Sequence, residues 1–373
     1  TYSGITKFFR DEDRKRRIIE INEIYGILDL GEVEMTVGKK VLSPDTNSLY
    51  PLSGFYHSLD LNVPVEPRIL GLWQVRADAT IKETNFTAYL FPVFQDHKIP
   101  GSKSRWMTNK KYNQYWFNDE FELSSYFDFL RSYLLYYFGD IFELDKTLKD
   151  LLDNKTVLIE NDLPEFKLEE IGYGGKAKTS LGKFDIFGTA YFGPNPYPVV
   201  KIVDKGNYMS VQKKNPPVWR LATGGTATWR DFEFHTEIMY NSAINNTDDD
   251  YISYTGGLTY SSETLSSFMG IDLIQSRIDY AGEQITKDQN HEGYYFSSRE
   301  IRQFTNDILF QLVMQINDDT NAIYFLDASL AYNAWHHRIS GSYRLYPGLV
   351  AECFVDLFDG DDQSFIGMWK DNN

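Results

Sequence analysis

The chain has 373 residues and a formal net charge of -16, with 37 Lys and Arg against 53 Asp and Glu. This acidic balance argues against a nucleic-acid partner, because phosphate binding needs clustered Lys and Arg. A single cysteine, Cys353, excludes a disulfide framework and every metal site that needs several cysteines. Phe, Trp and Tyr make up 16% of the residues, which is more than a soluble core requires.

No stretch of the sequence approaches the roughly 18 apolar residues that a transmembrane helix requires. Mean hydropathy is -0.41, a value typical of soluble chains. A membrane-spanning β-strand alternates lipid-facing and lumen-facing residues, however, so its average hydropathy stays low. Periodicity of two is therefore a more informative signal than overall hydropathy.

Alternation of apolar and polar residues begins near residue 33. Val33, Met35 and Val37 alternate with Glu34 and Thr36. The same alternation recurs, in chain order, over residues 73–81, 171–181, 219–230, 232–241, 308–317 and 324–333. One such segment is common, but a long series of them predicts an antiparallel sheet of many strands.

The connections between these strands are alternately short and long. Short connections are expected at 31–32, 83–84, 181–183, 230–231, 261–264, 318–321 and 347–348. Long polar connections are expected at 44–66, 98–165, 194–216, 244–250, 284–304 and 359–373. Short turns on one rim and long loops on the other are typical of an outer-membrane barrel, which has periplasmic turns and extracellular loops.

Seven hairpins give about fourteen strands within the chain. We expect the first strand to begin near Arg16 and to run to the turn at Gly31, with residues 1–9 at the upper end of a preceding strand. A closing strand is expected after Asn373, and the start of the chain is not expected to be that of a secreted precursor. The predicted fold class is all-β: residues 1–373 form a single transmembrane antiparallel up-and-down β-barrel of about 16 strands, with its end strands truncated.

The long connection 98–165 is expected to be an insertion containing a helix at about 121–153. Apolar residues recur there at spacings of three and four, which is the helical period. The residues expected on the apolar face are Tyr126, Leu130, Tyr133, Leu134, Tyr137 and Ile141. Such a helix packs over the barrel mouth as a lid, folds inward as a constriction or plug, or docks another protein or an amphipathic substrate.

Charged residues at the alternate positions of the strands are expected to line the lumen. These candidates are Lys40, Arg76, Asp78, Lys176, Lys178, Asp185, Arg220, Arg230, Glu233, His235, Glu237, Asp272, Asp327, Arg344, Glu352 and Asp356. Charges of both signs indicate a water-filled interior without strong selectivity for one sign. These residues either pair across neighbouring strands and solvate the lumen, or set a field across a constriction.

Neither a metal nor a cofactor is expected. The acidic runs 248–250 and 359–362 lack the spacing of a calcium loop and are expected at loop tips. His336 and His337 are adjacent in a strand, so they point to opposite faces and do not share a metal. The sequence also lacks a Gly-x-Ser-x-Gly elbow and a phosphate loop, so we do not expect an enzyme.

Several segments resemble a porin-like Gram-negative outer-membrane family catalogued as a domain of unknown function. They are EIYGILDLGEVEMTVGKKVLS, EPRILGLWQVRADATI, NFTAYLFPVFQDHKIP, EEIGYGGKAKTSLGKFDIFGTAYFGPNPYP and VAECFVDLFDGDDQSFIG. The resemblance implies a bacterial outer-membrane barrel and carries no catalytic signature. Some members are encoded near inner-membrane exporters, which implies export of a lipophilic or polymeric substrate.

Three functions are compatible with these patterns. The first is a porin-like channel for small or lipophilic solutes, in contact with outer-membrane lipid and lipopolysaccharide. The second is a structural barrel that anchors or houses a partner, such as an exporter adaptor in the periplasm or an electron-transfer protein. The third is a soluble β-rich carbohydrate-binding protein, which would have to bury its apolar strand faces against a second sheet.

Overall fold

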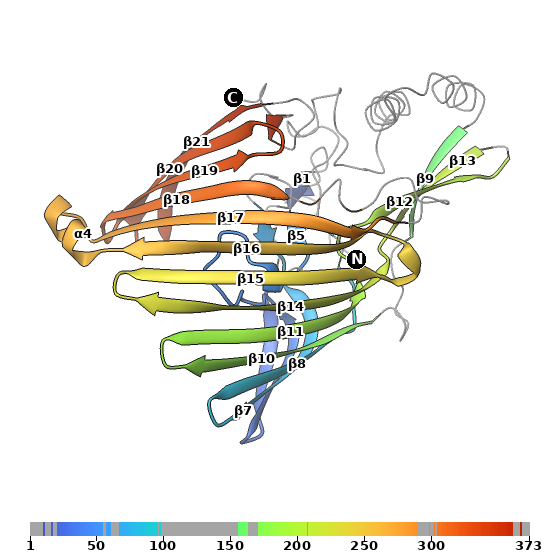
Figure 1. Cartoon of the computed structure of the whole chain (residues 1–373), viewed down its shortest axis with the longest axis horizontal. Coiled ribbons are helices and arrows are strands. Elements are labelled where there is room, and N and C mark those ends of the chain that lie inside the picture. Colours follow the sequence, from blue (N-terminus) through green and yellow to red (C-terminus); the bar gives the residue numbers. More distant parts are fainter. Residues whose placement is uncertain are drawn as a thin grey trace.

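The computed structural model describes residues 10–11, 16–17, 21–54, 57–60, 67–95, 97, 156–162, 171–206, 208–289, 298, 302, 304–360 and 366–367. Most of these residues belong to one antiparallel sheet of fourteen strands. In chain order the strands are β3 (Ile24–Asp29), β4 (Val33–Lys40), β7 (Leu72–Ile81), β8 (Thr84–Phe91), β10 (Gly172–Leu181), β11 (Phe184–Pro194), β14 (Pro217–Trp229), β15 (Phe232–Ala243), β16 (Asp250–Ser261), β17 (Leu273–Lys287), β18 (Asn306–Asn317), β19 (Thr320–Ser329), β20 (Ala334–Tyr346) and β21 (Leu349–Asp359). The sheet curls, so that its first strands, blue in Figure 1, pass behind its central strands.

Each strand of this sheet pairs with the strands that precede and follow it, which is the up-and-down order. The structure thus confirms the all-β antiparallel class and the fourteen strands counted from hairpins. Strands β3 and β21 are the two edges, and neither has a further partner among the described residues. The expected start near Arg16 is wrong, because β3 begins at Ile24; Arg16–Arg17 is the short strand β2, paired with β1 (Arg10–Asp11).

Tight turns join the strands at one end of the sheet. Several residues of these turns have a positive φ: Lys82 (58°), Gly182 (66°), Arg230 (54°) and Gly348 (85°). Two-residue hairpin turns need this conformation, which Gly adopts without steric cost. These turns therefore set the strand register, and through it the face of the sheet to which each side chain points.

The connection between β16 and β17 is not the short turn expected at 261–264. It contains helix α4 (Glu263–Met269). The Ser262 side chain caps this helix by accepting a hydrogen bond from the Leu265 N–H at 3.3 Å, and Gly270 ends it with φ 70°. A helix of seven residues is too short to show an apolar periodicity, so its sequence signal is confined to the capping residues Ser262 and Gly270.

Small elements fill part of the long connections. The region 194–216 was expected to be a loop, but it contains the hairpin of β12 (Val199–Asp204) and β13 (Tyr208–Lys214). Strand β9 (Thr156–Asp162), from the 98–165 insertion, pairs in parallel with β13. The predicted helix at about 121–153 and its six apolar residues lie outside the described residues.

The remaining elements are short. They are the pair β5 (Leu59–Asp60) and β6 (Arg68–Ile69) and the single turns η1 (Leu52–Gly54) and η3 (Ile244–Asn246). Among the residues that the structure describes, no helix is both long enough and apolar enough to cross a membrane.

The two faces of the sheet differ sharply in polarity. The registers of neighbouring strands place Phe184, Leu221 and Ile238 on one face, where they are 58%, 53% and 46% exposed. The opposite face carries Arg220 and Glu237, which are 3% and 1% exposed. We call the apolar, exposed face the outer face and the polar, covered face the inner face. This is the reverse of a soluble sheet, which buries its apolar side.

Candidate functional site on the inner face

Part of the connection between β4 and β7 folds back onto the inner face of the sheet. We call residues 42–54 the inner segment. At one end Leu42 packs with Leu72, Tyr89 and Tyr191, and at the other Leu52 packs with a second set of side chains. That second set is Tyr197, Ala222, Met239 and Tyr251. Full burial of a leucine contributes about 1.5–3 kcal/mol, so these two contacts stabilise the inward position at both ends.

Glu237 of β15 holds the inner segment at two points. Its carboxylate accepts a hydrogen bond from the Ser53 N–H at 2.6 Å and another from the Thr46 hydroxyl. Glu237 is almost fully buried, and a buried carboxylate is tolerated only where hydrogen bonds replace its hydration. The anchoring of the segment and the burial of this charge therefore depend on each other.

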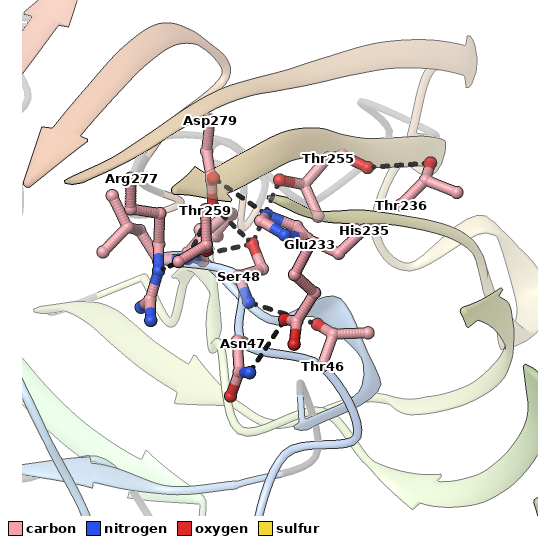
Figure 2. Close-up of polar contacts among 12 residues, drawn as sticks. Thr46, Asn47, Ser48, Glu233, His235, Thr236, Thr255, Thr259, Arg277 and Asp279 are labelled. Atoms are coloured by element: carbon pink, nitrogen blue, oxygen red, sulfur yellow. Dashed lines mark hydrogen bonds and ion pairs between the residues drawn. The ribbon is translucent and has the colours of Figure 1, made fainter. Parts of the chain in front are cut away.

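Asp279 of β17 holds the middle of the inner segment. Figure 2 shows Ser48 and His235 pointing toward this carboxylate. It accepts hydrogen bonds from the Ser48 hydroxyl at 2.9 Å and the Leu49 N–H at 2.6 Å, and its second oxygen lies 2.8 Å from His235 Nε2. The side chains of Asp279 and His235 are both fully buried. Ser48 also lies 3.2 Å from the Thr255 hydroxyl, which adds a contact to β16.

The rim of the inner segment makes more exposed contacts. Asp45 pairs with Lys176 at 2.8 Å, and its backbone carbonyl accepts a hydrogen bond from Lys178 at 3.3 Å. The Asn47 amide donates to Glu233 at 2.8 Å (Figure 2). These contacts tie the segment to β10 and β15, although solvent weakens exposed polar pairs.

His57 lies just beyond the inner segment and is almost fully buried. Burial, together with the nearby Lys176 charge, lowers the pKa of His57 to about 3. The imidazole is therefore neutral at any physiological pH, and protonating it would favour release of this region into water.

A second buried network lies near the long-loop end of the sheet. Arg302 donates two hydrogen bonds to Glu283, at 2.7 and 2.8 Å, and its guanidinium lies 3.9 Å from the centre of the Tyr251 ring. Burial alone would lower the pKa of Arg302, but the Glu283 carboxylate beside it raises the pKa above its ordinary value. Asp248 accepts from the Ser298 N–H at 2.8 Å, and burial raises the pKa of Asp248.

Fourteen of the sixteen residues predicted to line the lumen lie in strands, and the registers place them on the inner face. They are Lys40, Arg76, Asp78, Lys176, Lys178, Asp185, Arg220, Glu233, His235, Glu237, Asp327, Arg344, Glu352 and Asp356. Several are paired. Arg76 contacts Asp78 at 2.6 Å, Arg220 donates to Asn241 at 2.8 Å, and Asp356 lies 2.8 Å from His336 and 2.7 Å from Arg338.

Two predicted lumen residues are not on the inner face of a strand. Arg230 occupies the two-residue turn between β14 and β15, where its guanidinium lies 5.1 Å from the centre of the Trp229 ring on the outer side. Asp272 is exposed in the connection between α4 and β17. Alternation assigns a face only inside a strand, so it does not apply at these two positions.

Sequence reasoning missed the inner segment itself and three of the charges that organise the inner face. Asp279, Glu283 and Arg277 alternate along β17 with the outward Ile278 and Tyr280, so the period-two pattern could have found them. Residues 44–66 were expected to form an extracellular loop. Their contacts to Glu237 and Asp279 join residues 184 to 231 positions apart, and no local pattern encodes such contacts.

Comparison with known proteins adds little at the level of sequence. No protein-family model matches the chain, and no curated protein matches it. Among solved structures, the outer-membrane expressed OmpT of Vibrio cholerae aligns over 85% of this chain and 69% of its own, with 9% identity and a TM-score of 0.34. OccK8 (OprE) of Pseudomonas aeruginosa aligns over 90% of this chain and 75% of its own, with 9% identity and a TM-score of 0.41.

Proposed function

We propose that the chain forms the wall of an outer-membrane β-barrel that works as a porin-like channel for small solutes. The observation that carries the proposal is the polarity of the sheet, which is apolar and exposed outside and polar and covered inside. Lipid-facing and lumen-facing residues alternate in this way along membrane-spanning strands.

Exposing the whole outer face to water would be energetically costly. Trp73, Phe86, Trp219, Trp229 and Ile339 are each more than two-fifths exposed, and they come from different parts of the sheet. Monomeric soluble proteins rarely expose apolar patches larger than a few hundred Å². A hydrocarbon environment removes this cost, and the sheet hydrogen bonds satisfy the backbone groups that would otherwise be unpaired in lipid.

The inner segment gives the channel a constriction. It crosses the inner face of β14–β17 and is held by Glu237 and Asp279, so solutes must pass the remaining inner surface. That surface carries paired charges of both signs, including Arg338 with Asp356 and Arg76 with Asp78. We therefore expect a narrow pore with weak selectivity between anions and cations.

A second candidate function is favoured by the same segment. If the segment stays docked, it closes part of the interior, and the barrel then serves as an anchor or housing for a partner protein, such as an exporter adaptor. The exposed outer face disfavours the third candidate, a soluble carbohydrate-binding protein, because the described residues contain no second sheet that covers it.

The test of the channel is single-channel conductance of the full-length protein in planar bilayers, together with fractionation of the producing cells. Stable, small conductance steps and recovery in the outer membrane are the expected results. A protein that inserts without conducting would overturn the channel and leave the anchor function. A protein that stays in the aqueous fraction would overturn both.

A further inference from the structure

The outer face contains an open apolar groove near the short-turn end of β8, β10, β11, β14 and β15. Its volume is about 760 Å³, within the range of about 300–1,000 Å³ that small-molecule sites occupy. Outward residues of all five strands line it, among them Thr84, Ile186, Gly188, Gly225, Phe234 and Ile238. The lining residues that point inward lie on β11, β14 and β15, and each stands between two outward lining residues of the same strand. The groove therefore opens on the outer face.

Two glycines on β11 and β14 form the floor of the groove, for different reasons. A Cβ added at Gly225 would lie 2.4 Å from the Asp185 carbonyl oxygen, so the close approach of the strands requires glycine there. A Cβ added at Gly188 would meet no heavy atom within 4 Å. The structure around Gly188 thus leaves open space in the middle of a strand, where a bulky side chain would ordinarily pack.

The short-turn end of the groove is basic and aromatic. Lys183 and Arg230 are exposed in the two turns that bound it, and Arg230 lies over Trp229, which points outward. Lys82 in the neighbouring turn adds a third cation, while Glu83 and Asp231 supply two carboxylates. Cations beside an outward tryptophan at the end of an apolar groove match the phosphate and acyl chain of one phospholipid.

We propose that this groove binds one glycerophospholipid, with an acyl chain between Ile186 and Ile238 and the phosphate near Lys183 and Arg230. The inference rests on the proposed function, because the groove meets lipid only if the outer face lies in a bilayer. The apolar walls supply affinity through burial of methylene groups, and the turn cations select a phosphate over an uncharged head group.

The test is native mass spectrometry of the full chain released from detergent micelles after incubation with phosphatidylglycerol. Gly188→Leu fills the groove, and Gly26→Leu is the matched control, because Gly26 faces outward on β3 with equal space for a Cβ. We expect one retained lipid on the wild type and on Gly26→Leu. Losing burial of about two methylene groups corresponds to roughly tenfold weaker retention for Gly188→Leu.

The head group is tested with a double variant, Lys183→Gln with Arg230→Gln, and with diacylglycerol as the phosphate-free probe. We expect the double variant to retain phosphatidylglycerol no better than the wild type retains diacylglycerol. If Gly188→Leu does not fold, Phe234→Ala replaces it, because it removes one wall of the groove. Equal lipid retention by the groove variant and Gly26→Leu overturns the inference, whereas insertion of the wild type into bilayers would still support the proposed function.

Discussion

The carboxylate of Glu237 offers the sharpest test of the inner segment. It accepts hydrogen bonds from the Ser53 N–H and the Thr46 hydroxyl while almost fully buried. Glu237→Gln keeps the shape and one acceptor oxygen, but replaces the second with an amide and removes the charge. A hydrogen bond to a charged group contributes about 1.5–3 kcal/mol, which corresponds to a shift of about 10- to 150-fold from the docked toward the released segment.

The assay is amide hydrogen exchange of the peptide that covers the inner segment, measured in detergent and again in lipid vesicles. When the inner segment docks again faster than its exposed amides exchange, the exchange rate is proportional to the fraction of molecules with the segment released. Protection of the Ser53 and Leu49 amides should therefore fall by the same factor. Single-channel recordings of Glu237→Gln should show longer-lived states of higher conductance.

Glu233→Gln is the matched control for this experiment. Glu233 lies four residues earlier on the same face of β15, but among the described residues its carboxylate accepts one side-chain hydrogen bond, from Asn47, at a partly exposed position. Its replacement should cost less than about 1 kcal/mol, as exposed polar pairs do. Equal effects of the two variants, or unchanged exchange in Glu237→Gln, would refute the anchoring role of Glu237.

Three other changes test the buried groups and the outer face. Burial lowers the pKa of His57 from 6.5 to about 3, so the stability that the neutral imidazole contributes is present above pH 6.5 and is lost as the pH falls. Docking of the inner segment should therefore be about 2 kcal/mol weaker at pH 5 than at pH 7.5. His57→Gln should remove this pH dependence from the hydrogen exchange of the segment. Arg302→Ala leaves Glu283 buried without its partner and should destabilise the fold by about 3–5 kcal/mol in denaturant titrations in micelles; an unchanged midpoint would contradict the pairing. Leu221→Arg should destabilise the vesicle-inserted protein by about 2–4 kcal/mol near the bilayer centre, whereas Gln311→Arg on the inner face should change stability little; similar costs would argue against a lipid-facing outer surface.

The strands were predictable because their signal is local. Along β11 the exposed Phe184 and Ile186 alternate with the less exposed Asp185 and Phe187, and the turn at Gly182 fixes the register with β10. The number of strands in the sheet and the face of most lumen charges therefore follow from period two and the hairpin turns.

The inner segment was not predictable from the sequence for a physical reason. Its polar residues, such as Asp45, Asn47 and Ser48, read as a solvated loop because their partners lie on distant strands. Only the tertiary structure shows that inner-face carboxylates replace water as partners for these groups. Arg230 was assigned to the wrong place because a turn with a positive φ interrupts the alternation.

The central claim is that the outer face contacts lipid and the inner face contacts water, and labelling along β18 tests it most directly. With the exposed Cys353 replaced by serine, single cysteines are introduced at Phe310, Gln311 and Leu312, which point alternately outward, inward and outward. In lipid vesicles, a water-soluble maleimide should label position 311 and spare 310 and 312. Labelling of all three positions, or of 310 and 312 alone, would contradict the account.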